Sequence, residues 1–368
     1  MDGTGARRSA RQGAHGVAQL SSVATAAGPL EDLPPGWTLE ETTGPLGFVT
    51  RARLRSPDGE RLEWTSRRHR KGLGLLPGAL ETVRARAAGH PRPDNTSIAL
   101  AALFGIGSTC FALGSLPPYF NAFSAKTVGV TFFIGSIFFT TAAYLQFHEA
   151  MHAPQGITSD ARRPGVIASL VGWQPRRLDW WATAVQFVGT IMFNVSTFAA
   201  IGAGDDLTKL QRWVWAPDVG GSICFLVASW LAYSEVNRGV LPRSDHSMGW
   251  RIAAVNMAGS IAFGVSAVAA RYRDGQVADP ALVNASTFVG ALCFLAGALL
   301  LPVESSVDSA PAGTMPPRAA GSNPGAPRAR TVTPGEPPGP GKAHPNGTRF
   351  RRSGHLRLRG GCTPRCGE

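Results

Sequence analysis

The sequence contains one motif whose residue types and spacing are those of a catalytic metal site. His148-Glu149-Ala150-Met151-His152 fits the pattern H-E-x-x-H. On a helix the two histidines lie one turn apart and can bind zinc, while the glutamate activates a water molecule. A zinc-dependent intramembrane hydrolase is therefore one candidate function, with His148 and His152 as the metal ligands.

Three features of the sequence argue against this interpretation. Asp218, the side chain that could serve as a third ligand, is expected at the opposite membrane face from the histidines. Pro154 and Gly156 end the helix just after the motif. Glu149 also belongs to a repeated series, described below, that accounts for it without catalysis. We therefore predict no catalytic residue, no bound metal and no cofactor.

Polar side chains within apolar segments form a second set of candidates. Four are predicted to face the interior of a helical bundle: Gln186, Asn194, Asp218 and Asn256. They could line a path for a solute or a proton, or they could form hydrogen bonds between helices. The second interpretation is favoured, because no apolar segment carries a carboxylate paired with a base near its middle.

These residues lie in segments that are long enough to cross a bilayer. A transmembrane helix needs about 20 mostly apolar residues. Six windows meet this requirement: 97–116, 127–147, 181–201, 214–233, 251–270 and 281–301. Trp and Tyr residues cluster at their ends, as is typical of a membrane–water interface. The sequence therefore predicts an all-α membrane protein with a six-helix transmembrane domain at 97–302.

The basic residues of the connecting segments predict the orientation of the spans. Lys and Arg are frequent before the first span and between the second and third, whereas the loops on the other side are shorter and contain fewer of them. Cytoplasmic segments of membrane proteins carry this excess. We therefore expect a multi-pass protein of the bacterial inner (plasma) membrane with both termini in the cytoplasm.

One pattern recurs in all six spans: a Gly, a Phe four residues later, and small residues seven and eight positions after the Gly. On a helix, positions 0, 4 and 7 share one face. Small residues let the backbones of neighbouring helices approach closely in lipid, so we predict a helix-packing face. Its members are Gly107, Gly135, Gly189, Gly221, Gly259 and Gly290, with Phe111, Phe139, Phe193, Phe225, Phe263 and Phe294.

The spacing of the copies indicates a repeated helical hairpin. The glycines of the odd-numbered spans are separated by 82 and 70 residues, and those of the even-numbered spans by 86 and 69. Fourteen residues after the even-numbered glycines stand Glu149, Glu235 and Glu304, whereas no acidic residue follows the others at that distance. We therefore predict three related hairpins arranged about an axis along the membrane normal.

Outside the spans, residues 36–72 are predicted to form a small β element. Apolar and polar residues alternate on both sides of a turn at Ser56–Gly59, which predicts a hairpin. The basic run Arg67–Lys71 is interpreted as the positive flank of the first span, with a contact to the membrane surface as the alternative. Residues 73–96 are expected to be a cytoplasmic linker, and the basic segments 1–35 and 303–368 to be disordered.

The charge balance is basic, with 36 Lys and Arg against 24 Asp and Glu and a formal net charge of +12. In a chain with membrane spans we expect the lipid bilayer as the partner, with anionic head groups at the basic termini and no nucleic acid. The five cysteines suggest no disulfide framework, because their number is odd and three of them lie in apolar segments. The sequence identifies no protein partner.

Two stretches resemble YrhK-type membrane domains: Phe132–Gln146 (FFIGSIFFTTAAYLQ) and Asn284–Pro302 (NASTFVGALCFLAGALLLP). The wider region, about residues 97–305, resembles multi-span actinobacterial proteins built on that theme. YrhK-type domains are small two-helix units of unknown function. The resemblance implies a hairpin fold and a membrane location and carries over no activity. The histidines that flank Glu149 are not part of its pattern.

Together these observations favour a polytopic inner-membrane protein with a structural or sensory role. A small-solute transporter or channel is the first alternative, and the zinc-dependent hydrolase is the second. The interior of the bundle discriminates between the first two. A transporter needs a continuous polar cavity that reaches the middle of the membrane, whereas a scaffold is filled by side chains.

Overall fold

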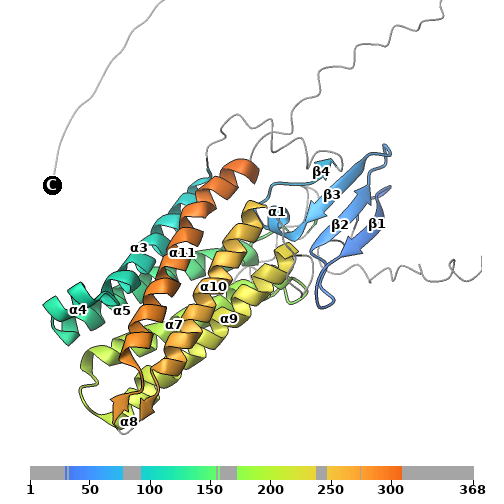
Figure 1. Cartoon of the computed structure of the whole chain (residues 1–368). Helices are drawn as coiled ribbons and strands as arrows, with labels where there is room; N and C mark the ends of the chain where they lie inside the picture. Colours follow the sequence, from blue (N-terminus) through green and yellow to red (C-terminus); the bar gives the residue numbers. More distant parts are fainter. Residues whose placement is uncertain are drawn as a thin grey trace, which may run out of the picture. The chain divides into compact units, whose positions relative to one another are not determined.

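The computed structural model describes residues 30, 33–77, 93–154, 156–157, 172–237, 247–273 and 275–308. The segments predicted to be disordered, 1–35 and 303–368, lie for the most part outside these residues, and so does most of the expected linker at 73–96. The described residues are mostly helical, with a small sheet near the N-terminus (Figure 1).

Six helices are long and apolar enough to cross a membrane. They are α3 (Asn95–Gly114), α5 (Ala125–Met151), α7 (Leu178–Gly202), α9 (Ala216–Asn237), α10 (Met248–Ala269) and α11 (Pro280–Asp308). A short helix, α8 (Leu207–Lys209), and a π-helical segment, η2 (Leu210–Trp215), lead directly into α9. The predicted six-span, all-α membrane fold is therefore confirmed.

Several helices begin before the predicted apolar windows because polar residues cap them. Asp94, Ser124 and Ser247 accept hydrogen bonds from backbone N–H groups in the first turns of α3, α5 and α10. At the other end of the membrane domain, α11 continues past Pro302 to Asp308. The predicted start of the C-terminal tail at residue 303 is therefore wrong.

The connections at the opposite ends of the helices are short. α4 (Pro117–Ala122) joins α3 to α5, and β5 (Tyr272–Arg273) pairs antiparallel with β6 (Gln276–Val277) between α10 and α11. The prolines at 117 and 118 occupy the first turn of α4. Proline is tolerated there because the first N–H groups of a helix have no partner within it.

The six helices form a closed ring. Each packs against the next in chain order, and α11 packs back against α3. Figure 1 shows these helices lying side by side along their lengths. At the closing seam, the hydroxyl of Ser305 donates a hydrogen bond to the carboxylate of Asp94 and accepts one from its backbone N–H at 3.0 Å. The ring therefore encloses an interior that all six helices can reach.

The glycines of the repeat bring the two helices of each hairpin together. Gly107 faces Gly135, Gly189 faces Gly221, and Gly259 faces Gly290. A Cβ atom built on any of them would lie 2.9 to 3.2 Å from the carbonyl oxygen of its partner, closer than side chains normally pack. Only glycine permits this approach without a shift of the backbone. The same contact recurs in all three hairpins, which confirms the predicted three-hairpin fold.

The phenylalanines of the repeat fill the interior of the ring. All six are buried in one cluster: Phe111, Phe139, Phe193, Phe225, Phe263 and Phe294. They contact one another across the interior. Phe111 and Phe263 pack edge to face with their ring centroids 5.8 Å apart, and Phe139 and Phe294 do the same at 5.8 Å. Aromatic side chains thus occupy the middle of the ring.

The N-terminal sheet has four antiparallel strands in the order of the chain: β1 (Thr38–Thr43), β2 (Arg51–Arg55), β3 (Arg61–Thr65) and the two-residue β4 (Leu76–Pro77). β2 and β3 are the predicted hairpin. Buried Leu54 and Trp64 lie in its small apolar core. β1 was not predicted, because this edge strand is polar at most positions and pairs Glu40 and Glu41 with arginines of β2.

An ionic lock and a polar cavity at one end of the helix ring

Strand β3 leads directly into a short basic helix, α1 (Ser66–Arg70), whose sequence is Ser-Arg-Arg-His-Arg. Lys71 follows at its C-terminal end, where the helix dipole favours positive charge. Despite this composition α1 is not exposed, since Ser66, Arg68 and His69 are buried. Its partner is one end of the helix ring, which we call the α1 end.

Two glutamates of the repeat form ion pairs with α1. A guanidinium nitrogen of Arg67 lies 2.6 Å from a carboxylate oxygen of Glu304, in the last turns of α11. A guanidinium nitrogen of Arg70 lies 3.8 Å from a carboxylate oxygen of Glu149, near the end of α5. The pair with Glu304 has hydrogen-bonding distance, whereas the pair with Glu149 is a longer electrostatic contact.

The third glutamate of the repeat also reaches α1. The hydroxyl of Ser66 donates a hydrogen bond to the carboxylate of Glu235, near the end of α9. Beside it, Nζ of Lys71 lies 3.2 Å from Glu304 and 3.1 Å from Asp308. We call the contacts of α1 and Lys71 with these helix ends the ionic lock. The lock joins the N-terminal sheet to α5, α9 and α11.

A further carboxylate of the lock is completely buried. Asp179, in the first turn of α7, pairs with the adjacent Arg177 and lies 3.4 Å from Arg70. An unpaired carboxylate in this position would be strongly destabilising, so Arg177 and Arg70 stabilise the start of α7. Through Arg70 the lock extends to α7 and thus contacts four of the six helices.

Burial and pairing act in opposite directions on the cations of the lock. Burial by itself would lower the pKa of Arg67, but the negative charge of Glu304 raises this pKa above its ordinary value. Burial also opposes the charge of Arg70, and nearby carboxylates, led by Glu235 and Asp179, raise its pKa. Both guanidiniums therefore remain charged at neutral pH.

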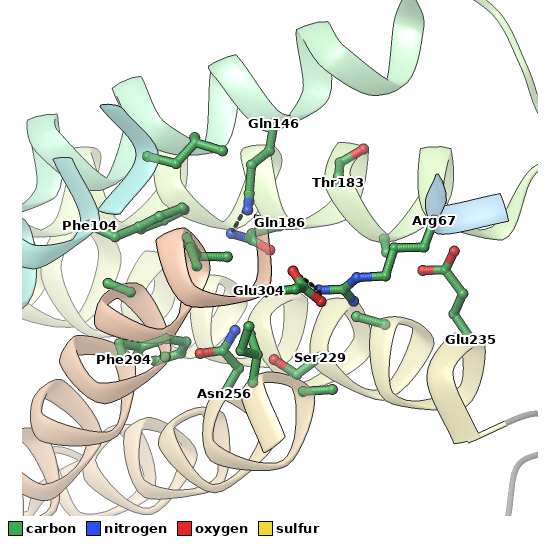
Figure 2. Close-up of a pocket in the computed structure, with 18 of the residues that line it drawn as sticks. Arg67, Phe104, Gln146, Thr183, Gln186, Ser229, Glu235, Asn256, Phe294 and Glu304 are labelled. Atoms are coloured by element: carbon green, nitrogen blue, oxygen red, sulfur yellow. Dashed lines mark hydrogen bonds and ion pairs between the residues drawn. The ribbon is translucent and has the colours of Figure 1, made fainter. Parts of the chain in front are cut away.

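A cavity of about 120 Å³ lies between the lock and the phenylalanine-filled interior. Figure 2 shows the Arg67–Glu304 pair beside this space, with Phe104 and Phe294 on another side of it. Amide side chains from α5, α7 and α10 complete the lining. The cavity therefore has a charged wall, an apolar wall and a wall of neutral polar groups.

Equivalent positions of the repeat build this cavity. The residues three positions before the first glycine of each hairpin all line it: Phe104, Gln186 and Asn256. The residues eleven positions after the second glycine line it too: Gln146, Ala232 and Leu301. Three of these six side chains are carboxamides and three are apolar. Equivalent backbone positions of the three hairpins therefore carry side chains of different polarity.

The three carboxamides differ in their hydrogen bonds. The amide nitrogen of Gln186 donates to the side-chain oxygen of Gln146 at 3.2 Å (Figure 2). Within the described part of the chain, the side chain of Asn256 has no hydrogen-bond partner. Gly297 of α11 makes room for it, because a Cβ atom at 297 would overlap Oδ1 of Asn256. The cavity therefore contains one carboxamide whose donors and acceptor are unused.

The other two predicted interior residues lie elsewhere. The amide of Asn194 donates to the hydroxyl of Thr140 at 2.7 Å, which is the interhelical hydrogen bond that the favoured interpretation expected. Asp218 lies in the first turn of α9, at the end of that helix opposite Glu235. The residues that line the cavity include neither Asn194 nor Asp218. Of the four candidates, only Gln186 and Asn256 are brought together.

The H-E-x-x-H motif lies at the end of α5, which ends at Met151. The rings of His148 and His152 stack with their centroids 4.0 Å apart. The residues that the structure describes contain no group of three His, Cys, Asp or Glu side chains that could hold a metal ion. Glu149, which would activate water in such a site, lies against Arg70. The arrangement of these residues does not support zinc chemistry.

The lock itself was not predicted. The basic run Arg67–Lys71 was interpreted as a positive flank or a membrane-surface contact, and the structure instead places Arg67, Arg70 and Lys71 against carboxylates. The two signals were present in the sequence as a basic cluster and as the series of three glutamates. Nothing in their spacing linked them, because the contacts span up to 237 residues of chain.

The six apolar helices make this chain a polytopic membrane protein. No family model matches it, and neither does any curated protein or any solved structure.

Proposed function

We propose that the chain is a bacterial inner-membrane protein with a structural or sensory role, in which the helix ring holds the N-terminal sheet at the cytoplasmic face. The observation that carries this proposal is the convergence of Glu149, Glu235 and Glu304 on α1. One element that follows directly from the sheet contacts the same repeat position in all three hairpins. The contact of α1 with the three glutamates can transmit a conformational change between the sheet and the helix ring.

The packing of the ring supports this role better than transport. A transporter needs a polar passage through the middle of the membrane, and the interior there holds the six phenylalanines of the repeat. The cavity at the α1 end favours a sensory role over a purely structural one. The proposal retains cytoplasmic termini, on the basis of the loop charges, and a membrane contact of the basic ends with anionic lipids.

The resemblance to YrhK-type domains remains a prediction, and it is compatible with a protein made of paired helices without an enzymatic site. The zinc-dependent hydrolase receives no support from the site, since Glu149 contacts Arg70.

The docking of the sheet can be tested by a distance measurement. Spin labels would be placed at Asp58, in the exposed turn of the β2–β3 hairpin, and at Arg251, on the exposed side of α10, after replacement of the native cysteines. Double electron–electron resonance should give one narrow distance distribution. The double variant Arg67→Gln/Arg70→Gln should broaden it, because it removes two cations of the lock.

The matched control is Arg53→Gln, which breaks an ion pair with Glu41 that is exposed at the surface of the sheet. This variant should leave the distribution narrow. A broad distribution in the wild type, or a narrow one in the lock variant, would refute the proposed role of the lock.

A further inference from the structure

We infer that the cavity at the α1 end is a binding site for a small uncharged solute of the carboxamide type, one that both donates and accepts hydrogen bonds. The inference deepens the proposed sensory role by naming the ligand class, and it rests on that role only for the consequence that binding is sensed.

The size of the cavity limits the ligand. Its volume of about 120 Å³ is well above the roughly 10–15 Å³ that one water molecule requires. The cavity therefore has room for a small molecule such as a simple amide.

The charges around the cavity exclude an ion as the preferred ligand. The described residues that line the cavity include two cations, Arg67 and Arg70, and three carboxylates, Glu149, Glu235 and Glu304. The two guanidiniums already face carboxylates, and Glu235 accepts a hydrogen bond from Ser66. Because each charged group of the wall already has a partner, an added ion would lose its hydration without compensation.

The neutral polar wall matches a carboxamide. Gln146, Gln186 and Asn256 each present one acceptor and two donors, and only one hydrogen bond joins them. Asn256 in particular has an unused amide in the described part of the chain, and Gly297 leaves the space that its side chain occupies. Phe104 and Phe294 provide an apolar surface for the remainder of the ligand.

The position of the site explains how binding could be sensed. Arg67 and Glu304 belong both to the cavity wall and to the lock. A ligand bound to Asn256 can also contact Arg67 only when α1 is docked against the helix ring. Its binding therefore favours the docked position of α1.

The test uses acetamide as the probe and acetate, which has the same shape and one negative charge, as its counterpart. Saturation-transfer NMR on the purified full chain in detergent micelles should detect acetamide and not acetate. Asn256→Leu keeps the approximate size of the side chain and removes its hydrogen bonds, so it should weaken acetamide binding at least tenfold. Gln186→Leu should weaken it as well and provides a second variant if the first fails to fold.

The control variant is Asn121→Leu, which changes an exposed amide on α4, remote from the cavity, and should leave binding unchanged. Equal signals from acetate and acetamide, or full binding by the folded Asn256→Leu variant, would overturn the inference. The spin-label distance between Asp58 and Arg251 is measured on the same samples. A wild type that binds acetate as well as acetamide but gives a narrow distance distribution would refute the ligand site alone. A broad distance distribution in the wild type would refute the proposed function.

Discussion

Arg67 and Glu304 lie 237 residues apart in the chain, yet their side chains form an ion pair in which the nitrogen and oxygen atoms are 2.6 Å apart. The carboxylate is nearly buried, with 5% of its side chain exposed, and the arginine has 21%. Gly249 of α10 lies against the pair, since a Cβ atom there would be 3.0 Å from Oε1 of Glu304. The ion pair is therefore enclosed by α1, α10 and α11.

The helix α1 is held on both of its sides. Ser66, Arg67 and Arg70, together with Lys71, face the carboxylates of the ring. The remaining two residues interact with main-chain oxygens. Arg68 donates to the carbonyl oxygens of Leu73 and Asp308, and Nε2 of His69 lies 2.6 Å from the carbonyl oxygen of Pro154. A basic helix is thus buried because nearly every polar group on it has a partner.

Replacement of Glu304 by glutamine should destabilise the protein by about 3 kcal/mol. The change keeps the shape of the side chain and leaves Arg67 and Lys71 without the carboxylate that they share. The measurement is denaturant unfolding in detergent micelles. A double-mutant cycle combines Glu304→Gln with Arg67→Gln. The losses of stability of the two single variants should sum to more than the loss of the variant with both changes, because each single change removes the same ion pair.

The matched control for Glu304→Gln is Glu41→Gln. Glu41 also forms a short ion pair, with Arg53, but 51% and 64% of the two side chains are exposed. Exposed pairs contribute at most about 1 kcal/mol, so this variant should unfold close to the wild type. Equal small losses of stability in Glu304→Gln and Glu41→Gln would show that the Arg67–Glu304 pair contributes no more than an exposed ion pair.

Gly189→Ala should destabilise the second hairpin by about 1–3 kcal/mol. A Cβ atom at 189 would lie 2.8 Å from Cβ of Cys224, which cannot move without its backbone. The measurement is again unfolding in micelles. The control is Gly202→Ala at the end of α7, where an added Cβ meets no atom within 4 Å. A neutral result at 189 would contradict the close approach of α7 and α9.

His69 should make the stability of the protein depend on pH. Burial lowers the pKa of His69 below its ordinary value of 6.5, although the hydrogen bond to Pro154 opposes this. The unfolded chain then binds the proton more tightly than the folded chain. Stability is complete above about pH 6.5 and is lost as the pH falls through the folded pKa, by at most about 1.4 kcal/mol per pH unit.

The measurement for His69 compares unfolding of the wild type and of His69→Gln between pH 8 and pH 5. The charged groups near the His69 imidazole, Arg177 and Asp179, are the same in both proteins. The difference between the two stability curves therefore reports the protonation of His69. The wild type should lose more stability on acidification than the variant. Parallel curves for the two proteins would show that His69 is not buried as a neutral group.

The features of the fold that repeat along the chain could be predicted from the sequence. The paired glycines and the phenylalanines share a spacing that a helix converts into one face, so the hairpins and their packing followed from local geometry. The sheet was predicted only in its central hairpin, because β1 presents one apolar residue, Leu39, among polar ones. The lock required knowledge of which distant charges meet, and no local pattern contains that information.

The cavity shows a second limit of the sequence analysis. Gln186, Asp218 and Asn256 hold the same position relative to their glycines, three residues before them, and were all predicted to face the bundle interior, with Asp218 expected at the membrane face opposite His148. Successive helices run in opposite directions, however, so this position lies toward the α1 end in α7 and α10 and toward the other end in α9. Asp218 is therefore separated from Gln186 and Asn256 by the length of the phenylalanine-filled interior.

The proposed orientation predicts which residues can be labelled from outside the cell. Thr208→Cys, in the exposed segment before α9, should react with a membrane-impermeant maleimide in intact cells, whereas Asp58→Cys in the sheet should react only after the membrane is opened. The basis is the excess of Lys and Arg in the segments on the side of the sheet, because segments with such an excess tend to stay in the cytoplasm. A variant without cysteines gives the background. Labelling of Asp58→Cys in intact cells would place the sheet outside, and the lock would then join the ring to an external element.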